Sequence, residues 1–230
     1  MSTLIPLVLA TFNPGKVREY QALFQHLPVR LMGLRSLGIE TLPPETGDTF
    51  VENARLKAQA VFDATGLPAL GDDSGLEVRA LGGAPGVHSA RFAGPAQDAR
   101  ANLDLLLRRM EGIDDRRARF VCALVGVFPA GWLPADLSRE LGHPHLEVLE
   151  DRDRRAWMVT ALGTVEGILL QEPRGEGGFG YDPIFYREDL GGTFGEAPED
   201  VKNRLSHRGQ AASRMALVLA RLMPPGDVAP

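Results

Sequence analysis

Apolar runs and amphipathic stretches alternate along the whole chain. The short apolar runs are typical of buried strands, because their residues are apolar on both faces. The stretches between them carry apolar residues at helical spacing, three and four positions apart. This alternation predicts an α/β protein, with one generous domain or two small ones in 230 residues. The predicted strands are 4–10, 29–34, 67–70, 119–128 and 156–170, and the predicted helices are 17–27, 49–64, 97–110 and one that follows Ser206.

Four polar residues, Asp72, Asp73, Ser74 and Gly75, follow the apolar run 67–70. A strand that ends in two carboxylates delivers negative charge to the sheet edge where open α/β sheets bind ligands. Adjacent carboxylates in a confined site repel each other, and a divalent cation such as magnesium relieves that repulsion. The alternative is a solvated turn, which these four residues alone favour, since all are turn formers.

The segment 11–16 joins the first predicted strand to the first predicted helix. Asn13 is a good N-cap, and Pro14 is a good first helical residue. The free N–H groups of a helix start favour an anion, and Lys16 one turn into the helix favours a phosphate. A plain capped helix is the alternative. The segment is not a Walker A loop, because the leading glycine and the Lys-Ser/Thr pair are missing.

The helix predicted over 49–64 begins with a capping box formed by Thr49 and Glu52. Its apolar residues form one stripe along the helix. Asn53 and Lys57 lie four positions apart and therefore share one face. A solvated helix face is the usual place of such residues, and the residues alone give no more than that.

Glycines and aromatic residues are concentrated in 175–183. The glycines let a backbone approach a ligand closely, and Phe179 and Tyr181 offer ring faces for stacking. A stacking platform of this kind also occurs in modules that bind single-stranded RNA. The net charge of −5 and the lack of a basic groove argue against that alternative.

A basic pair opens the last predicted helix. Ser206 is a natural N-cap, so His207 and Arg208 would lie in the first turn. Cations are unfavourable there, because the helix dipole is positive at its N-terminus. The pair therefore favours a bound anion or another hydrogen-bond acceptor over a role in helix stability.

Composition places the chain among ordinary globular proteins, with 44% hydrophobic and 24% charged residues. The one cysteine, Cys122, lies in an apolar run and is expected to be a small buried hydrophobe. Because no disulfide can form within the chain, we expect a reducing compartment, the cytoplasm. The apolar run 4–10 is too short and uncharged for a signal peptide, and no segment reaches membrane-spanning length.

Two further features carry no predicted chemistry. The five histidines show no zinc-like spacing. Residues 129–155 are rich in proline, glycine and charge, which predicts an excursion of loops and a hairpin.

Together, the motifs resemble those of the inosine triphosphate pyrophosphatases, the Ham1-like family of house-cleaning enzymes for deaminated purine nucleotides. The resemblance covers nearly the whole chain, and several long motifs in the same order make it highly specific. Two departures are visible: Phe12 stands where the family commonly has Gly, and 194–201 replaces the usual run before Lys202. The matching segments are 10–16, 45–54, 72–76, 81–91, 177–183 and 202–211.

The resemblance implies a single α/β domain over residues 1–230, with a long mixed central sheet flanked by helices and two lobes around an active-site cleft. It implies a homodimer that hydrolyses ITP, dITP and XTP to the monophosphate and pyrophosphate with magnesium, without nucleic-acid or membrane partners. The alternative is a purine-nucleotide-binding regulator that has lost turnover. The presence of Asp73, Glu45 and Lys16 argues against that alternative.

The resemblance also implies roles for individual residues. Asp73 would activate the attacking water and, with Glu45, would bind magnesium; Asp72 is a neighbouring candidate. The residues that would hold the phosphates are Thr11, Asn13, Lys16 and Lys57. The base would stack on Phe179, and the other substrate contacts would be Ser74, Gly180, Tyr181, Asp182, Lys202, His207 and Arg208.

Overall fold

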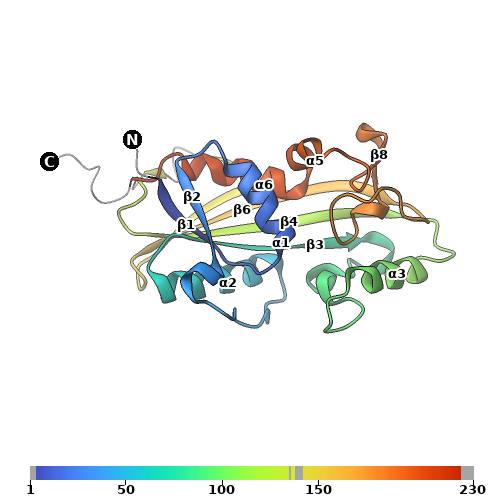
Figure 1. Cartoon of the computed structure of the whole chain (residues 1–230), viewed down its shortest axis with the longest axis horizontal. Helices are drawn as coiled ribbons and strands as arrows, with labels where there is room; N and C mark the ends of the chain where they lie inside the picture. The colour runs from blue at the N-terminus through green and yellow to red at the C-terminus, as the bar shows by residue number, and fades with distance from the viewer. Residues whose placement is uncertain (1–3, 135, 138–141, 224–230) are drawn as a thin grey trace. The chain divides into compact units, whose positions relative to one another are not determined.

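The computed structural model describes residues 4–134, 136–137 and 142–223. The strands of this part are β1 (Ile5–Leu9), β2 (Val29–Gly33), β3 (Ala69–Val78), β4 (Arg117–Pro129), β5 (Leu146–Asp151), β6 (Ala156–Leu169), β7 (Phe185–Arg187) and β8 (Gly192–Thr193). They form one mixed sheet in the order β2-β1-β3-β4-β6-β7-β8, with β5 paired to β6 (Figure 1). β1 is parallel to β2 and β3, whereas β6 is antiparallel to β5 and β7. The predicted α/β class with a mixed central sheet is confirmed.

The helices begin where the capping residues predict. The Asn13 side chain accepts hydrogen bonds from the backbone N–H groups of Gly15 and Lys16, and Thr49 with Glu52 forms the complete capping box. The α-helices of the described residues are α1 (Pro14–Phe24), α2 (Phe50–Thr65), α3 (Ala99–Arg109), α5 (Glu199–Leu205) and α6 (His207–Leu219). The 3-10 helices are η1 (Leu34–Leu37), η2 (Arg79–Leu81), η3 (Gly86–Arg91), η4 (Asp182–Ile184) and η5 (Glu188–Leu190).

The chain divides into two compact units. Unit 1 contains Met1–Asp73, Ala123–Gly163 and Gln210–Pro230, and unit 2 contains Ser74–Cys122 and Thr164–Gly209. Three strands, β3, β4 and β6, therefore each contribute residues to both units.

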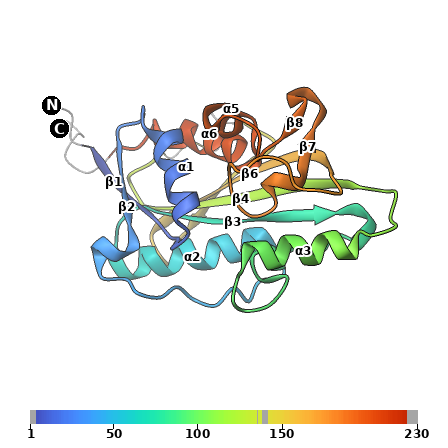
Figure 2. The same cartoon turned by 45° about the vertical axis from the view of Figure 1, so that its right-hand side comes forward.

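In unit 1, α1 and α2 cover opposite faces of the sheet (Figure 2). The contact between α2 and β3 is very close at Gly71, where a Cβ atom would lie 2.0 Å from the Ala54 carbonyl oxygen. Only glycine fits such an approach of two backbones. The apolar stripe of α2 is buried as predicted, and its members are Phe50, Ala54, Ala58 and Val61.

Unit 2 has its own apolar core. α3 is capped by Asp98, whose side chain accepts from the Ala101 N–H, and it turns Leu103 and Leu106 inward. Phe185 and Phe194 stack at 5.3 Å between ring centroids. Phe194, at the start of the segment 194–201, is a core side chain of unit 2. The helix after that segment, α5, begins at Glu199.

The predicted turn at 72–75 is wrong, because β3 continues without interruption from Ala69 to Val78. Turn propensity is a local preference, and here the tertiary setting overrides it. β3 lies between two strands of the sheet, which pair its backbone, and the side chains of Asp72 and Asp73 find buried partners. The consequence for the site is large, because a strand and a turn direct adjacent side chains differently.

Within 129–155, β5 forms an antiparallel hairpin with β6. Residues 135 and 138–141 of the predicted excursion lie outside the described residues. None of the helices in the described part of the chain has the length and apolar character needed to span a membrane.

Candidate active site

Asp72 and Asp73 direct their side chains to opposite faces of β3. Successive side chains of a strand alternate between the two faces of the sheet. Asp72 contacts residues of α1, and Asp73 contacts residues of α2 and of the loop before it. The two carboxylates are therefore separate parts of the site, and the repulsion expected between neighbours in a turn does not arise.

On the α1 side, Asp72 is fully buried and holds two partners. Its Oδ2 accepts a hydrogen bond from the Tyr20 hydroxyl at 2.6 Å, and its Oδ1 forms an ion pair with the Lys16 ammonium. The Lys16 side chain keeps 13% of its surface exposed. Lys16 is therefore tied to the strand, and part of its side chain stays exposed.

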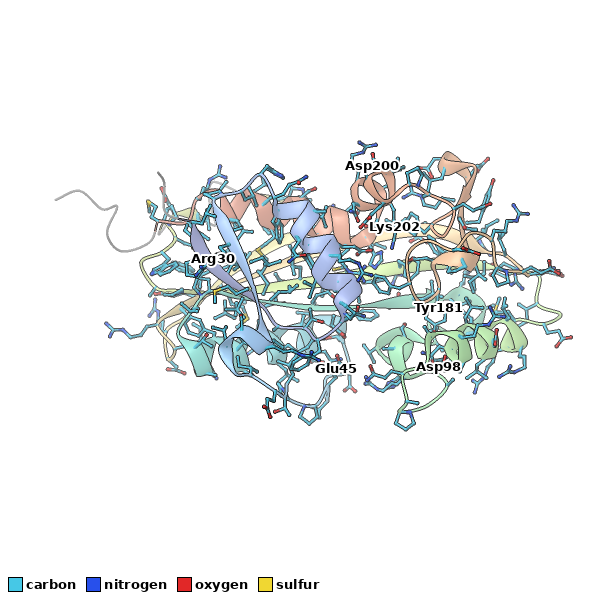
Figure 3. All side chains as sticks on the ribbon, in the orientation of Figure 1. Arg30, Glu45, Asp98, Tyr181, Asp200 and Lys202 are labelled. Atoms are coloured by element: carbon cyan, nitrogen blue, oxygen red, sulfur yellow. The ribbon has the colours of Figure 1, made fainter. Side chains whose placement is uncertain are left out.

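On the α2 side, two carboxylates converge on one ammonium group. Lys57 Nζ donates to Glu45 Oε1 at 2.9 Å and to Asp73 Oδ1 at 3.1 Å. Glu45 lies in the loop that precedes α2 (Figure 3). Asn53 completes the group, since its Nδ2 donates to Asp73 Oδ2 at 3.3 Å and its Oδ1 accepts from the Gly47 N–H at 2.8 Å.

Asn53 and Lys57 are both buried. The sequence pattern favours a solvated helix face for these two residues, and that prediction is wrong. Their common face is turned toward the sheet, because β3 offers a carboxylate that an amide and an ammonium can satisfy. A lysine is buried at low cost only when it is paired in this way.

The charges of this cluster are out of balance in favour of the acidic groups. Glu45 and Asp73 bring two negative charges and Lys57 brings one positive charge, whereas Asp72 is balanced by Lys16 on the other face of β3. Burial raises the pKa of Asp73, with the attraction of Lys57 and Lys16 opposing this. Burial also lowers the pKa of Lys57, but the attraction of Asp73 and Glu45 outweighs it, so that pKa is raised. An added cation would relieve the excess negative charge.

The donor set fits a hard divalent cation. In the described part of the chain, no three His, Cys, Asp or Glu residues are arranged to hold a metal. Glu45 and Asp73 alone converge, as their shared contact with Lys57 shows. Magnesium is commonly bound by one or two carboxylates, with water and substrate phosphates completing its coordination.

The loop before α1 places two more predicted residues. Thr11 Oγ1 accepts from the Asn13 N–H at 3.1 Å, and Asn13 Oδ1 accepts from the Gly15 N–H at 2.8 Å. Asn13 thus shapes the helix start, and its amide oxygen is engaged within the loop. Phe12, the departure from the family pattern, is 42% exposed.

In unit 2, Asp182 organises the glycine-rich loop. Its Oδ2 accepts from the Phe179 backbone N–H at 2.7 Å and from Lys202 Nζ at 2.7 Å. Gly178 adopts φ +72°, and a Cβ there would lie 2.2 Å from the Asp182 carboxylate, so only glycine fits. Gly180 follows with φ +64°, and the loop presents the half-buried Phe179 ring.

Two cations flank the Phe179 ring. Lys202 Nζ lies 5.0 Å and the Arg208 guanidinium carbon 5.1 Å from the ring centroid, within cation–π range. Arg208 Nη2 also donates to Ser74 Oγ at 2.9 Å. The structure therefore brings four of the predicted substrate-contacting residues into one group, which we call the aromatic–basic cluster: Ser74, Phe179, Lys202 and Arg208.

Two predicted substrate contacts have neighbours in the core of unit 2. The Tyr181 hydroxyl donates to the Ser89 carbonyl oxygen at 2.9 Å, and burial raises the pKa of Tyr181. The His207 ring stacks on Phe120 with 4.7 Å between centroids. His207 begins α6 as predicted, and Ser206 Oγ accepts from the Gly209 N–H at 3.0 Å.

Sequence reasoning missed Tyr20 as a residue of the site. Its ring is fully buried, and its hydroxyl reaches Asp72. A signal was available, because Tyr20 lies four positions after Lys16 and therefore on the same face of α1. An aromatic residue on the apolar face of a helix is most often core, and only the hydroxyl distinguishes this one.

Comparison with known proteins gives consistent matches. The model of the Ham1 family matches residues 7–217. A dITP/XTP pyrophosphatase from Thermus thermophilus is 46% identical, covering 96% of this chain and 95% of that protein. A dITP/XTP pyrophosphatase from Deinococcus radiodurans is also 46% identical, covering 91% and 90%. The structure of a HAM1 protein from Coxiella burnetii is 36% identical with a TM-score of 0.75, covering 94% and 98%.

Proposed function

The chain belongs to the Ham1 family, and we propose that it hydrolyses the non-standard purine nucleoside triphosphates ITP, dITP and XTP to the monophosphate and pyrophosphate. Such an activity removes deaminated purines from the nucleotide pool. Relatives 40–46% identical over most of the chain carry the name dITP/XTP pyrophosphatase. The observation that carries the proposal is the group of Glu45, Asp73 and Lys57, which combines acidic and basic side chains as phosphoryl transfer requires.

We propose that the metal is magnesium and that Glu45 and Asp73 would bind it. Magnesium would neutralise the phosphate oxygens and polarise a water molecule when it is bound. The residues of the chain supply the rest. Lys16 and Lys57 stabilise the negative charge that develops on the phosphates, and the raised pKa of Lys57 keeps it protonated at neutral pH.

Asp73 is proposed to accept the proton of the attacking water. In the metal-free protein, burial raises the pKa of Asp73, so its carboxylate is a stronger base there than an exposed aspartate. Asn53 Nδ2 fixes the orientation of the carboxylate by donating to Oδ2. Hydrolysis between the α- and β-phosphates then needs no covalent intermediate with the protein.

We assign the base to the aromatic–basic cluster of unit 2. Stacking on Phe179 accepts any purine, because every purine has a π-face. Arg208 is a fixed donor that cannot lose its proton. Hypoxanthine and xanthine carry an oxo acceptor at C6, whereas adenine carries an amino donor there. A donor left facing the amino group of adenine costs about 1–3 kcal/mol, or roughly tenfold to hundredfold in specificity.

We also propose that the protein acts as a cytoplasmic homodimer, as its family resemblance implies. The single buried cysteine, Cys122, is compatible with a reducing compartment. Size-exclusion chromatography with light scattering tests the oligomeric state. A mass of one chain, 24.9 kDa, at micromolar concentration would contradict the dimer.

The reaction itself is tested by identifying the products of ITP. Incubation with magnesium and analysis by phosphorus NMR is expected to give IMP and pyrophosphate in equal amounts. IDP with inorganic phosphate would contradict cleavage between the α- and β-phosphates. Tight binding of ITP without any product would instead favour the regulator that has lost turnover.

A further inference from the structure

A buried carboxylate outside the metal-binding group links a buried tyrosine to a phosphate-site lysine. Asp72 has no exposed surface, and Tyr20 has none either. Tyr20 donates to one carboxylate oxygen at 2.6 Å, and Lys16 pairs with the other and also reaches the Asp72 backbone carbonyl oxygen at 3.4 Å. The three residues form one chain of contacts from the interior of unit 1 to the end of Lys16.

Asp72 is poorly placed to be a metal ligand. Both of its oxygens already accept from Tyr20 and Lys16. It also faces away from Glu45 and Asp73, because Asp73 is the next residue of a continuous strand. The negative charge of Asp72 acts on Lys16 instead.

We propose that Tyr20 and Asp72 are positioning residues that hold the Lys16 ammonium in place for the triphosphate, which rests on the proposed function. A lysine has a flexible four-carbon stem, and fixing it on substrate binding costs side-chain entropy. Because Asp72 already restrains the Lys16 side chain before the substrate binds, less side-chain entropy is lost on binding. The Tyr20 hydroxyl fixes the orientation of the Asp72 carboxylate by donating to Oδ2, and the carboxylate in turn orients Lys16.

The geometry of α1 supports a dedicated role for the Tyr20 hydroxyl. Lys16, Tyr20 and Phe24 follow each other at four-residue spacing, so all three lie on one face of the helix. Tyr20 and Phe24 stack at 5.6 Å between ring centroids. A phenylalanine would provide this packing equally well, whereas the hydroxyl of Tyr20 donates the hydrogen bond to Asp72.

The lysine content of the chain makes the proposal directly measurable. Lys16, Lys57 and Lys202 are the only lysines in the sequence, and every other strongly basic residue is arginine. An amine-reactive reagent such as acetic anhydride therefore reports on three side chains and the N-terminal amine. Lys57 and Lys202 serve as internal references, because Lys57 pairs with Glu45 and Asp73, and Lys202 pairs with Asp182.

The first experiment labels the metal-free protein and quantifies each lysine by mass spectrometry. In the Tyr20→Phe variant, labelling of Lys16 is expected to rise severalfold, while labelling of Lys57 and Lys202 stays unchanged. Tyr186→Phe is the matched control, because Tyr186 is a half-buried tyrosine of β7 in unit 2. An unchanged Lys16, or a rise at all three lysines, would overturn the proposal.

The second experiment measures binding of inorganic tripolyphosphate in the presence of magnesium by calorimetry. Tyr20→Phe is expected to weaken binding roughly threefold to tenfold, the range of one hydrogen bond. In a Lys16→Ala background, the same change is expected to have no further effect, because the lysine it positions is gone. Losses that multiply in the double variant would mean that Tyr20 acts on the fold and not through Lys16.

Lysine labelling and tripolyphosphate binding test the positioning role of Tyr20 and Asp72 independently of the proposed hydrolysis of ITP. If the protein does not hydrolyse ITP but the two substitutions are non-additive in tripolyphosphate binding, the positioning role stands and the reaction is wrong. If the wild-type protein hydrolyses ITP but Tyr20→Phe leaves both labelling and binding unchanged, the reaction stands and the positioning role is wrong. Failure of the wild-type protein to bind tripolyphosphate would overturn the positioning role as well.

Discussion

Asp72 and Asp73 are consecutive residues of β3, yet Asp72 binds Tyr20 and Lys16 of α1 while Asp73 binds Asn53 and Lys57 of α2. One strand thus supplies a carboxylate to each helix layer of unit 1. We infer different roles for the two carboxylates. Asp73 binds the metal and accepts a proton from the attacking water, whereas Asp72 positions Lys16.

Replacement of Asp73 by asparagine is expected to abolish most of the turnover without unfolding the protein. Asparagine keeps the shape and the contact with Asn53, but it loses the charge that holds a metal and accepts a proton. We expect kcat for ITP to fall about a hundredfold or more, which corresponds to about 3 kcal/mol of transition-state stabilisation. Asp63→Asn, an exposed position on α2, is the control. Near-normal kcat in Asp73→Asn at saturating magnesium would remove Asp73 from the mechanism.

Asp73 is also expected to make the metal-free protein less stable as pH rises. Its pKa is raised in the folded state above the usual 3.8, so the folded state binds the proton more tightly than the unfolded state. Relative to Asp73→Asn, the wild-type protein therefore loses stability as pH rises through the window that begins near 3.8 and ends at the raised pKa. Melting temperatures in EDTA at a series of pH values measure this difference. A wild-type protein that gains stability relative to the variant over that window would contradict the assignment.

Removal of the Lys57 charge is expected to destabilise the protein until a metal is added. Lys57→Met leaves Glu45 and Asp73 facing each other without their shared cation. Breaking a buried ion pair on one side costs about 3–5 kcal/mol. We expect magnesium to raise the melting temperature of Lys57→Met by more than it raises that of the wild-type protein.

Two comparisons sharpen this test. Arg55→Met removes an exposed positive charge from the same helix and is expected to have little effect on stability. The further change Asp73→Asn should restore part of the stability of Lys57→Met, because it removes one of the two uncompensated charges. If magnesium shifts Lys57→Met and the wild-type protein equally, Glu45 and Asp73 do not share a metal.

Substrate choice is expected to depend on Arg208 and substrate affinity on Phe179. Phe179→Ala should lower kcat/KM for every purine triphosphate by about tenfold to hundredfold, since stacking is indifferent to the base. Arg208→Ala should lower kcat/KM for ITP and XTP more than for ATP. Arg204→Ala, an exposed arginine of α5, is the control. An equal loss for ITP and ATP in Arg208→Ala would make Arg208 a phosphate ligand.

The sequence predicts the helices of the site better than its central strand. Asn13 and the pair Thr49 and Glu52 cap helices in any tertiary setting, because their hydrogen bonds are local. The strand through Asp72 and Asp73 depends on partners that are distant in sequence. Local turn propensity therefore gives the wrong answer there.

The burial of Asn53 and Lys57 could not be predicted from the sequence pattern, because it too depends on partners that are distant in sequence. Helical spacing shows that the two share a face, but it does not show what that face contacts. Tyr20 is the reverse case, since its burial follows from the apolar face of α1 while the role of its hydroxyl does not. The family resemblance supplies Lys57 and Asp73 but neither Tyr20 nor the orientation of Asp72.

The proposed hydrolysis of non-standard purine triphosphates is tested most directly by kcat/KM for ITP, dITP, XTP, GTP and ATP, measured with and without magnesium from the monophosphate and pyrophosphate formed. We predict turnover of ITP, dITP and XTP that requires magnesium, similar values for ITP and dITP, and values for ATP roughly tenfold to hundredfold lower. ATP used as well as ITP, or full turnover of ITP in EDTA, would contradict the account.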